Sequence, residues 1–159
     1  MEVKYHPSGA PPVELVGLFS DLVRLETELW DLVDHRLRGE HDLPLSWFEP
    51  MEVVDRVVDC RVVDIAEALS ITVGGVSKLV DRIEHAGWCV RAPNPNDARS
   101  SVVTLTPAGR RVLEVAQGSL GNELAVRLGA GVSPERLASF ASTVRDLRRH
   151  IADQLGDAR

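Results

Sequence analysis

The fold is decided by residues 64–84, which read DIAEALSITVGGVSKLVDRIE. A short helix over residues 62–69 has its apolar face at Ile65, Ala66 and Leu69. After a turn at residues 70–72, in which Ser70 or Thr72 can act as N-cap, a second helix runs to about residue 85. Gly87 then ends it. Two short helices joined by a tight turn predict a helix-turn-helix.

The second of these helices has one apolar side and one polar side. Its core-facing positions are Val76, Leu79, Val80 and Ile83. The opposite face carries Gly74, Lys78, Asp81, Arg82 and His85, with Gly75 and Ser77 at its edges. Such a face suits entry into a DNA major groove, and the glycines would let the backbone approach the sugar-phosphate chain. Asp81 is expected to pair with Lys78 or His85.

A β-hairpin follows the helix-turn-helix and completes a winged helix. Short strands are predicted at residues 88–92 and 101–106, around a loop at 93–100 that is rich in Pro and Asn. Arg99 near the tip can enter a minor groove, where the negative potential is greatest. Asp97 can hold that arginine through a charge-assisted hydrogen bond.

Long helices are predicted on both sides of this unit. The first spans about residues 13–38 and has a leucine seam at Leu15, Leu18, Leu22, Leu25, Leu29 and Leu32. One helix begins at Thr106-Pro107, and the last begins at Ser133 with a seam at Leu137, Phe140, Val144, Leu147, Ile151 and Leu155. These seams either bury each other within one chain or interleave with those of a second copy, and we favour the dimer.

The connection between the first helix and the winged helix is expected at residues 39–44. Ser46 and Glu49 are spaced as a capping box for the next helix, with Pro50 in its first turn. That helix is expected to end at Cys60-Arg61. The predicted organisation is a flexible segment at 1–12, an N-terminal dimerization helix and linker at 13–44, a winged helix-turn-helix at 45–106 and C-terminal dimerization helices at 107–159.

The net charge of −6 is unevenly distributed. Residues 13–59 hold 12 acidic against 4 basic side chains, whereas residues 60–112 hold 7 basic against 5 acidic ones. The middle third is therefore the segment to test for DNA contact. The first dozen residues lack the apolar run of a signal peptide, and no stretch has the ~20 apolar residues of a membrane helix, so a cytoplasmic protein is expected.

Several motifs follow one another along the chain: residues 64–84, Gly87-Trp88 and Arg91, the Asp97-Ala98-Arg99-Ser100 wing motif and Leu105-Thr106-Pro107-Ala108-Gly109. In these motifs the sequence resembles the MarR (multiple antibiotic resistance regulator) family. The resemblance implies a homodimer that binds a pseudo-palindromic operator in double-stranded DNA, usually as a repressor. It also implies release from DNA by a small phenolic or other aromatic acid. By matched position it implies DNA contacts from Ser77, Lys78, Arg82 and Arg99, with Asp97 bracing Arg99. Thr72, Gly74, Gly75 and Ser100 complete the candidate DNA-binding residues.

Other possible sites are weaker. Trp30, Trp47 and Phe48 can line an effector pocket, although core packing is the favoured role for each of them. Cys60 and Cys89 are expected to be buried, and no nucleophile motif, P-loop, metal site or cofactor site is visible. The sequence thus predicts a mainly α, winged-helix transcriptional regulator and not an enzyme. The alternative is a helical dimerization module that binds protein without a specific DNA target.

Overall fold

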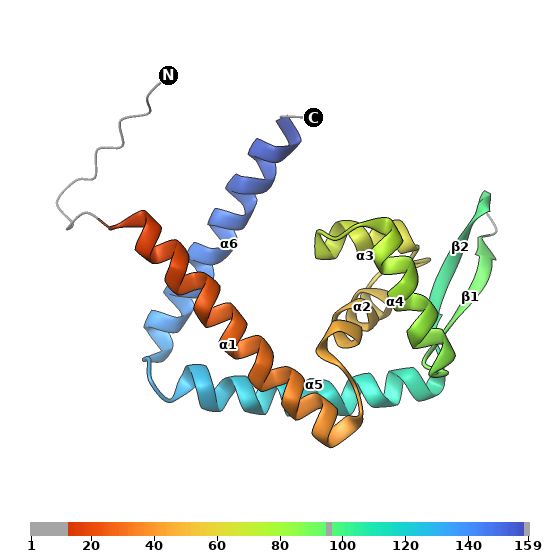
Figure 1. Cartoon of the computed structure of the whole chain (residues 1–159), viewed down its shortest axis with the longest axis horizontal. Coiled ribbons are helices and arrows are strands. Elements are labelled where there is room, and N and C mark those ends of the chain that lie inside the picture. The colour runs from red at the N-terminus through yellow and green to blue at the C-terminus, as the bar shows by residue number, and fades with distance from the viewer. Residues whose placement is uncertain (1–12, 95–96, 158–159) are drawn as a thin grey trace.

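The computed structural model describes residues 13–94 and 97–157, and within them the chain forms mostly helices and one antiparallel hairpin. The elements are α1 (Leu15–His41), α2 (Leu45–Arg56), α3 (Val62–Leu69), α4 (Val73–His85), β1 (Cys89–Asn94), β2 (Asp97–Leu105), α5 (Pro107–Gly129) and α6 (Pro134–Asp157). In Figure 1, α2 to α4 and the hairpin form one lobe, α6 and the N-terminal part of α1 stand apart from it, and α5 runs along the base of both. The predicted winged-helix fold is confirmed.

The first helix is longer than its sequence pattern indicated. Glu14 caps its start by accepting from the backbone N–H of Val16, and Asp42, in the left-handed conformation with φ 53°, ends it. The expected stop at Gly39 is therefore wrong. Ion pairs of Arg38 with Asp34 and of Arg36 with Glu40 stabilise the last turns of the helix. Gly39 lies inside these turns and lowers the stability of the helix only through its low helix propensity.

The predicted capping box of the second helix is also wrong. α2 begins at Leu45, two residues earlier than an N-cap at Ser46 predicts, and has no cap from its own N-cap residue, Pro44. Instead, the Asp34 carboxylate on α1 accepts from the Leu45 backbone N–H at 2.8 Å. Pro50 consequently lies beyond the first turn. The helix ends at Arg56 and not at Cys60, because the chain turns through Asp59 with φ 52° before Arg61 opens α3.

The helix-turn-helix itself has the predicted boundaries. α3 covers Val62–Leu69, and Ser70 ends it with φ 56°. Thr72 is the N-cap of α4, and its Oγ1 accepts from the backbone N–H of Gly75 at 3.2 Å. Gly87 has φ 78°, the conformation expected of the residue that turns the chain into the wing.

The strands of the wing are longer than predicted. Cys89 pairs with Leu105 at the base, and the ladder reaches Asn94 opposite Asp97, with an irregularity after Pro93. The Asn94 side chain donates to Ser100 Oγ at 2.9 Å, so the predicted loop residues continue the hairpin. The remaining tip, residues 95–96, lies outside the described chain.

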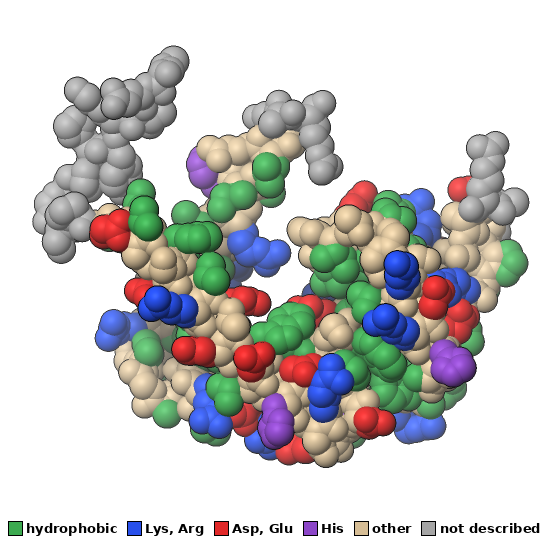
Figure 2. All heavy atoms as spheres, in the orientation of Figure 1, with side chains coloured by type: hydrophobic (Ala, Val, Ile, Leu, Met, Phe, Trp, Pro, Cys, Tyr) green, Lys and Arg blue, Asp and Glu red, His purple; other side chains and the backbone are tan. Residues whose placement is uncertain are grey.

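One hydrophobic core joins the winged helix to the central part of the molecule. It takes Val33 and Leu37 from α1, Leu113 and Ala116 from α5, and the inward faces of α2, α3, α4 and the hairpin. The outer half of α1 and most of α6 lie outside it. Figure 2 shows apolar side chains exposed along these helices. The exposed apolar residues of the two helices include Leu15, Val16, Phe19, Phe140, Leu147, Ile151 and Leu155. Within the described ranges, no helix has the length and apolar character needed to cross a membrane.

Candidate nucleic-acid interface and effector pocket

The two faces of α4 are separated as the sequence predicts. Val76, Val80 and Ile83 are at most 2% exposed, which fixes the rotation of the helix against the core. Lys78 and Arg82 are exposed on the other side, one turn apart. Of the other predicted contact residues on this helix, Ser77 is half-buried and Thr72, Gly74 and Gly75 are exposed. No side-chain heavy atom would lie within 4 Å of a Cβ at Gly74, so this part of the helix surface is open.

Asp81 has a different partner from the predicted one. Its Oδ1 lies 2.8 Å from Nη1 of Arg91, a residue of β1, and not against Lys78 or His85. The Glu84 carboxylate binds the same Arg91 Nη1 at 2.8 Å and accepts from the Arg91 backbone N–H at 2.8 Å. Arg91 Nη2 also donates to the backbone carbonyl of Ser77 at 3.1 Å. The negative charge of Asp81 on the exposed face of α4 is therefore largely neutralised by Arg91. The positive charges of Lys78 and Arg82 stay available for another partner.

The wing residues lie at the far end of the hairpin. Asp97 begins β2, and Ser100 Oγ donates to the Asp97 carbonyl at 3.2 Å while accepting from Asn94. Arg99 lies within β2, but its side chain is outside the described atoms. The pairing of Asp97 with Arg99 stays a prediction.

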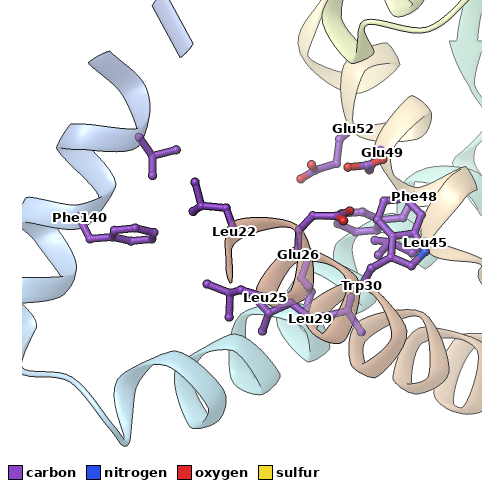
Figure 3. A pocket seen from close by; sticks show the side chains of 13 residues that line it. Leu22, Leu25, Glu26, Leu29, Trp30, Leu45, Phe48, Glu49, Glu52 and Phe140 are labelled. Carbon is purple, nitrogen blue, oxygen red and sulfur yellow. The ribbon is translucent and has the colours of Figure 1, made fainter. Parts of the chain in front are cut away.

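A pocket of about 500 Å³ lies between α1 and α2, with α5 and α6 at its edges (Figure 3). Trp30 and Phe48, both predicted effector residues, line it. Trp47 does not; it packs edge to face on Trp88, with ring centroids 5.7 Å apart. The other lining residues are Leu22, Leu25, Glu26, Leu29, Val33, Leu45, Glu49, Glu52, Leu120, Phe140 and Val144.

Three glutamates in this lining were not foreseen as site residues. Glu26 comes from α1, and Glu49 and Glu52 come from adjacent turns of α2. Burial raises the pKa of Glu49, and the nearby charges of Glu52 and Glu26 raise it further. The signal in the sequence was the interleaving of acids with the apolar stripe of α2, but Glu49 was interpreted as a capping residue. The family resemblance includes Arg91 but does not indicate that it pairs with acidic residues of α4.

The two cysteines are buried, as predicted. Cys60 is 1% and Cys89 2% exposed, and burial raises the pKa of each thiol to about 11. A thiol in such surroundings is a poor nucleophile near neutral pH.

Residues 55–101 match the family model described as MarR family. Curated relatives include the multiple antibiotic resistance protein MarR of Salmonella typhimurium, 32% identical over 78 residues, and that of Escherichia coli, 31% identical over 78 residues. Each match covers 49% of this chain and 54% of the relative, so the similarity spans about half the length of these proteins.

Solved structures share the fold over most of the chain. A mutant of Escherichia coli MarR complexed with operator DNA matches with a TM-score of 0.77 and 22% identity, covering 84% of this chain and 95% of that one. Sco3205, a MarR family transcriptional regulator from Streptomyces coelicolor in complex with DNA, matches with a TM-score of 0.78 and 21% identity, covering 89% and 90%. Residues 55–101 of this chain are thus similar in sequence to the MarR family model, and most of the chain has the fold of these solved structures.

Proposed function

We propose that this protein is a homodimeric, sequence-specific DNA-binding transcriptional regulator, with α4 in the major groove and the wing in the minor groove. The observation that carries the proposal is the exposed Lys78 and Arg82 face of α4, fixed outward by the buried Val76, Val80 and Ile83 beside a projecting hairpin. This is the geometry that a recognition helix needs.

The contacting residues follow from this placement. Lys78 and Arg82 would bind guanine edges or phosphates, and Ser77 and Thr72 would donate to phosphate or base atoms. Gly74 and Gly75 would let the start of α4 approach the DNA backbone. On the wing, Arg99 would enter the minor groove, with Asp97 and Ser100 holding the strand that presents it.

The dimer is proposed from the apolar surface that one chain leaves uncovered. Leu15, Phe19 and Val16 of α1 are between 68% and 73% exposed, and Ile151 and Leu155 of α6 are 53% and 64% exposed. Apolar helix faces of this extent normally pack on another surface. We therefore assign residues 13–44 and 107–159 to dimerization and residues 45–106 to DNA binding. Two-fold symmetry would then suit a pseudo-palindromic site.

We further propose that the protein is a repressor. A small molecule that binds the pocket between α1 and α2 would release it from DNA. The relative CouR is described as a transcriptional repressor bound to a 23-mer DNA duplex, which supports the repressor assignment. The pocket joins a dimerization helix to the first helix of the DNA-binding unit, so a ligand there can change their relative position. The second candidate, a protein-interaction module, would use the same helices without any DNA target.

The test measures binding of the purified protein to the DNA upstream of its own gene and to random DNA of equal length, across a salt series. One dimer per site, with preference for the upstream DNA and a steep loss of affinity with salt, is expected. Arg99→Ala should weaken the specific complex and leave the dimer intact, whereas Arg136→Ala, an exposed arginine at the start of α6, should change neither. Equal affinity of Arg99→Ala and the unmodified protein would contradict the assignment of the wing. Absence of binding to either DNA at low salt would favour the protein-interaction module.

A further inference from the structure

The pocket between α1 and α2 has an apolar body with three aromatic walls. Trp30 and Phe48 lie on one side and Phe140 of α6 on the other, and leucines of α1 form the floor (Figure 3). In a single chain its volume is about 500 Å³, in the range of sites that hold a small organic ligand. Part of its lining, including Leu22, Leu25 and Phe140, also belongs to the helix seams assigned to the dimer, so the partner subunit would border the pocket. The shape and lining therefore suit a molecule with an aromatic or otherwise hydrophobic body.

The ionisable side chains that line the pocket are all acidic. The ionisable residues in it are Glu26, Glu49 and Glu52, and within the described lining no Lys, Arg or His balances them. In Figure 3 the three carboxylates lie on the same side of the cavity, next to Phe48. Gln117 donates to Glu52 Oε1 at 3.3 Å, and the nearby Arg56 donates to the backbone carbonyl of Glu52 and not to its carboxylate.

We propose that the pocket binds lipophilic organic cations, meaning a hydrophobic aromatic body that carries an ammonium or amidinium group. The aromatic body would lie among Trp30, Phe48 and Phe140, and the cationic group would lie between Glu49, Glu52 and Glu26. This inference rests on the proposed function, since it names the ligand class of the proposed effector pocket. It also departs from the aromatic acids that the family resemblance implies.

A negatively charged and a positively charged ligand differ in their electrostatic energy at this position in the pocket. An aromatic carboxylate would add a fourth negative charge beside three carboxylates in a partly desolvated site, where charges interact more strongly than in water. A cation would relieve the repulsion between these carboxylates and gain charge-assisted hydrogen bonds. A cation can also interact with the partly buried ring of Trp30.

The test uses three probes with the same naphthalene body and different charge. These are 2-naphthylmethylammonium, 2-naphthoate and neutral 2-naphthylmethanol, each titrated calorimetrically into the full-length protein at pH 7.5 without DNA. We expect the cation to bind at least about tenfold more tightly than the carboxylate, with the neutral probe between them. Equal binding of all three, tighter binding of 2-naphthoate, or binding of none would overturn the proposal, the last because the cavity would then be closed or filled by the partner subunit.

Variants assign the selectivity to the carboxylates. Glu49→Gln and Glu52→Gln keep the shape of the side chain and remove its charge, so each should weaken the cation by about tenfold while the neutral probe binds as before. Retained binding of the neutral probe also reports that the pocket is folded. Glu114→Gln, at an exposed position of α5, is the matched control and should leave all three affinities unchanged. Unchanged cation affinity in both pocket variants would overturn the proposal.

Because these titrations contain no DNA, they are independent of operator binding. Cation binding by a protein that binds no DNA would refute the proposed regulator and leave the ligand class standing. A protein that binds its operator but prefers 2-naphthoate would give the reverse result.

Discussion

Arg91 on β1 and Asp81 on α4 form an ion pair with 2.8 Å between Nη1 and Oδ1, which joins the wing directly to the recognition helix. The same guanidinium binds Glu84 and the backbone carbonyl of Ser77, so one side chain contacts three successive turns of α4. Arg91 is only 21% exposed and is held on several sides, which fixes the wing relative to the helix. If the proposed function is right, Arg91 is a positioning residue for the DNA-binding surface.

Arg91→Gln should therefore weaken operator binding without disrupting the dimer. We expect a loss of about tenfold, or ~1.4 kcal/mol, because charge-assisted hydrogen bonds that align two recognition elements are removed. The measurement is the Kd for operator DNA at fixed salt, with sedimentation to confirm the dimer. Arg149→Gln, which removes an exposed ion pair with Asp146 on α6, is the control and should have no effect.

An Asp81→Asn variant distinguishes positioning from direct contact with DNA. If Arg91 acts through α4, the two substitutions together should cost less than the sum of their separate effects, because they break the same link. Strictly additive losses would mean that Arg91 contacts the DNA independently of Asp81.

Gly109 allows the close packing of α5 on the base of the wing. A Cβ there would overlap the carbonyl oxygen of Trp88 and lie 2.8 Å from the carbonyl carbon. Gly109→Ala should therefore lower stability by about 1–3 kcal/mol through overpacking. Gly118→Ala, on the same helix with nothing within 4 Å of its Cβ, should be neutral or stabilising by up to ~1 kcal/mol. Thermal unfolding of both variants checks the contrast, and equal melting temperatures would contradict it.

The elements that the sequence predicted best are those with local signals. Thr72 and Thr106 each cap a helix through a side chain three residues before the backbone N–H that it binds. The sequence predicts the cap at Thr106 and leaves the other open between Ser70 and Thr72, of which the structure has Thr72. The predicted start of α2 is wrong because the residue that caps it, Asp34, comes from a different helix. A local pattern cannot reveal a hydrogen bond between residues eleven positions apart, so Ser46 was preferred.

The same limit applies to the candidate sites. The exposed face of α4 follows from helical periodicity, and Lys78 and Arg82 could be placed on it from the sequence. The pairing of Asp81 depends on the path of β1 beside α4, and the acidic pocket depends on the crossing of α1 over α2. Both are tertiary relationships. Neither Arg91 nor Glu26 carries a local signal of its role.

Glu49 should make the stability of the protein depend on pH. Because burial and the charges of Glu52 and Glu26 raise the pKa of Glu49 above its ordinary value of 4.5, the folded state holds this proton more tightly than the unfolded state. Its contribution to stability is complete below pH 4.5 and is lost as the pH rises through the raised pKa. Glu49→Gln should therefore raise the unfolding temperature at pH 7 and have no such effect at pH 4. Glu114→Gln is the control, and equal shifts at both pH values would contradict the argument.

Cys60 and Cys89 should resist alkylation in the native protein. With the pKa of each thiol raised to about 11 by burial, about one thiol in a thousand is ionised at pH 8, and access is limited as well. Mass spectrometry after treatment with iodoacetamide should show little labelling in buffer and complete labelling in guanidinium chloride. Rapid labelling of native protein, or loss of operator binding with mild peroxide, would instead indicate a redox-sensing role.

Lys78 offers a direct test of how α4 meets DNA, because the sequence contains just one other lysine, Lys4. Its exposed ammonium should react readily with an acetylating reagent in the protein alone and should be protected when α4 enters the major groove of the operator. Acetylation at Lys78, measured by mass spectrometry, should fall several-fold with operator DNA and much less with random DNA at the same salt. Lys78→Arg keeps the charge and removes the reactive amine, so it identifies the labelled peptide. Unchanged reactivity of Lys78 in a saturated operator complex would mean that another surface of the protein binds the DNA.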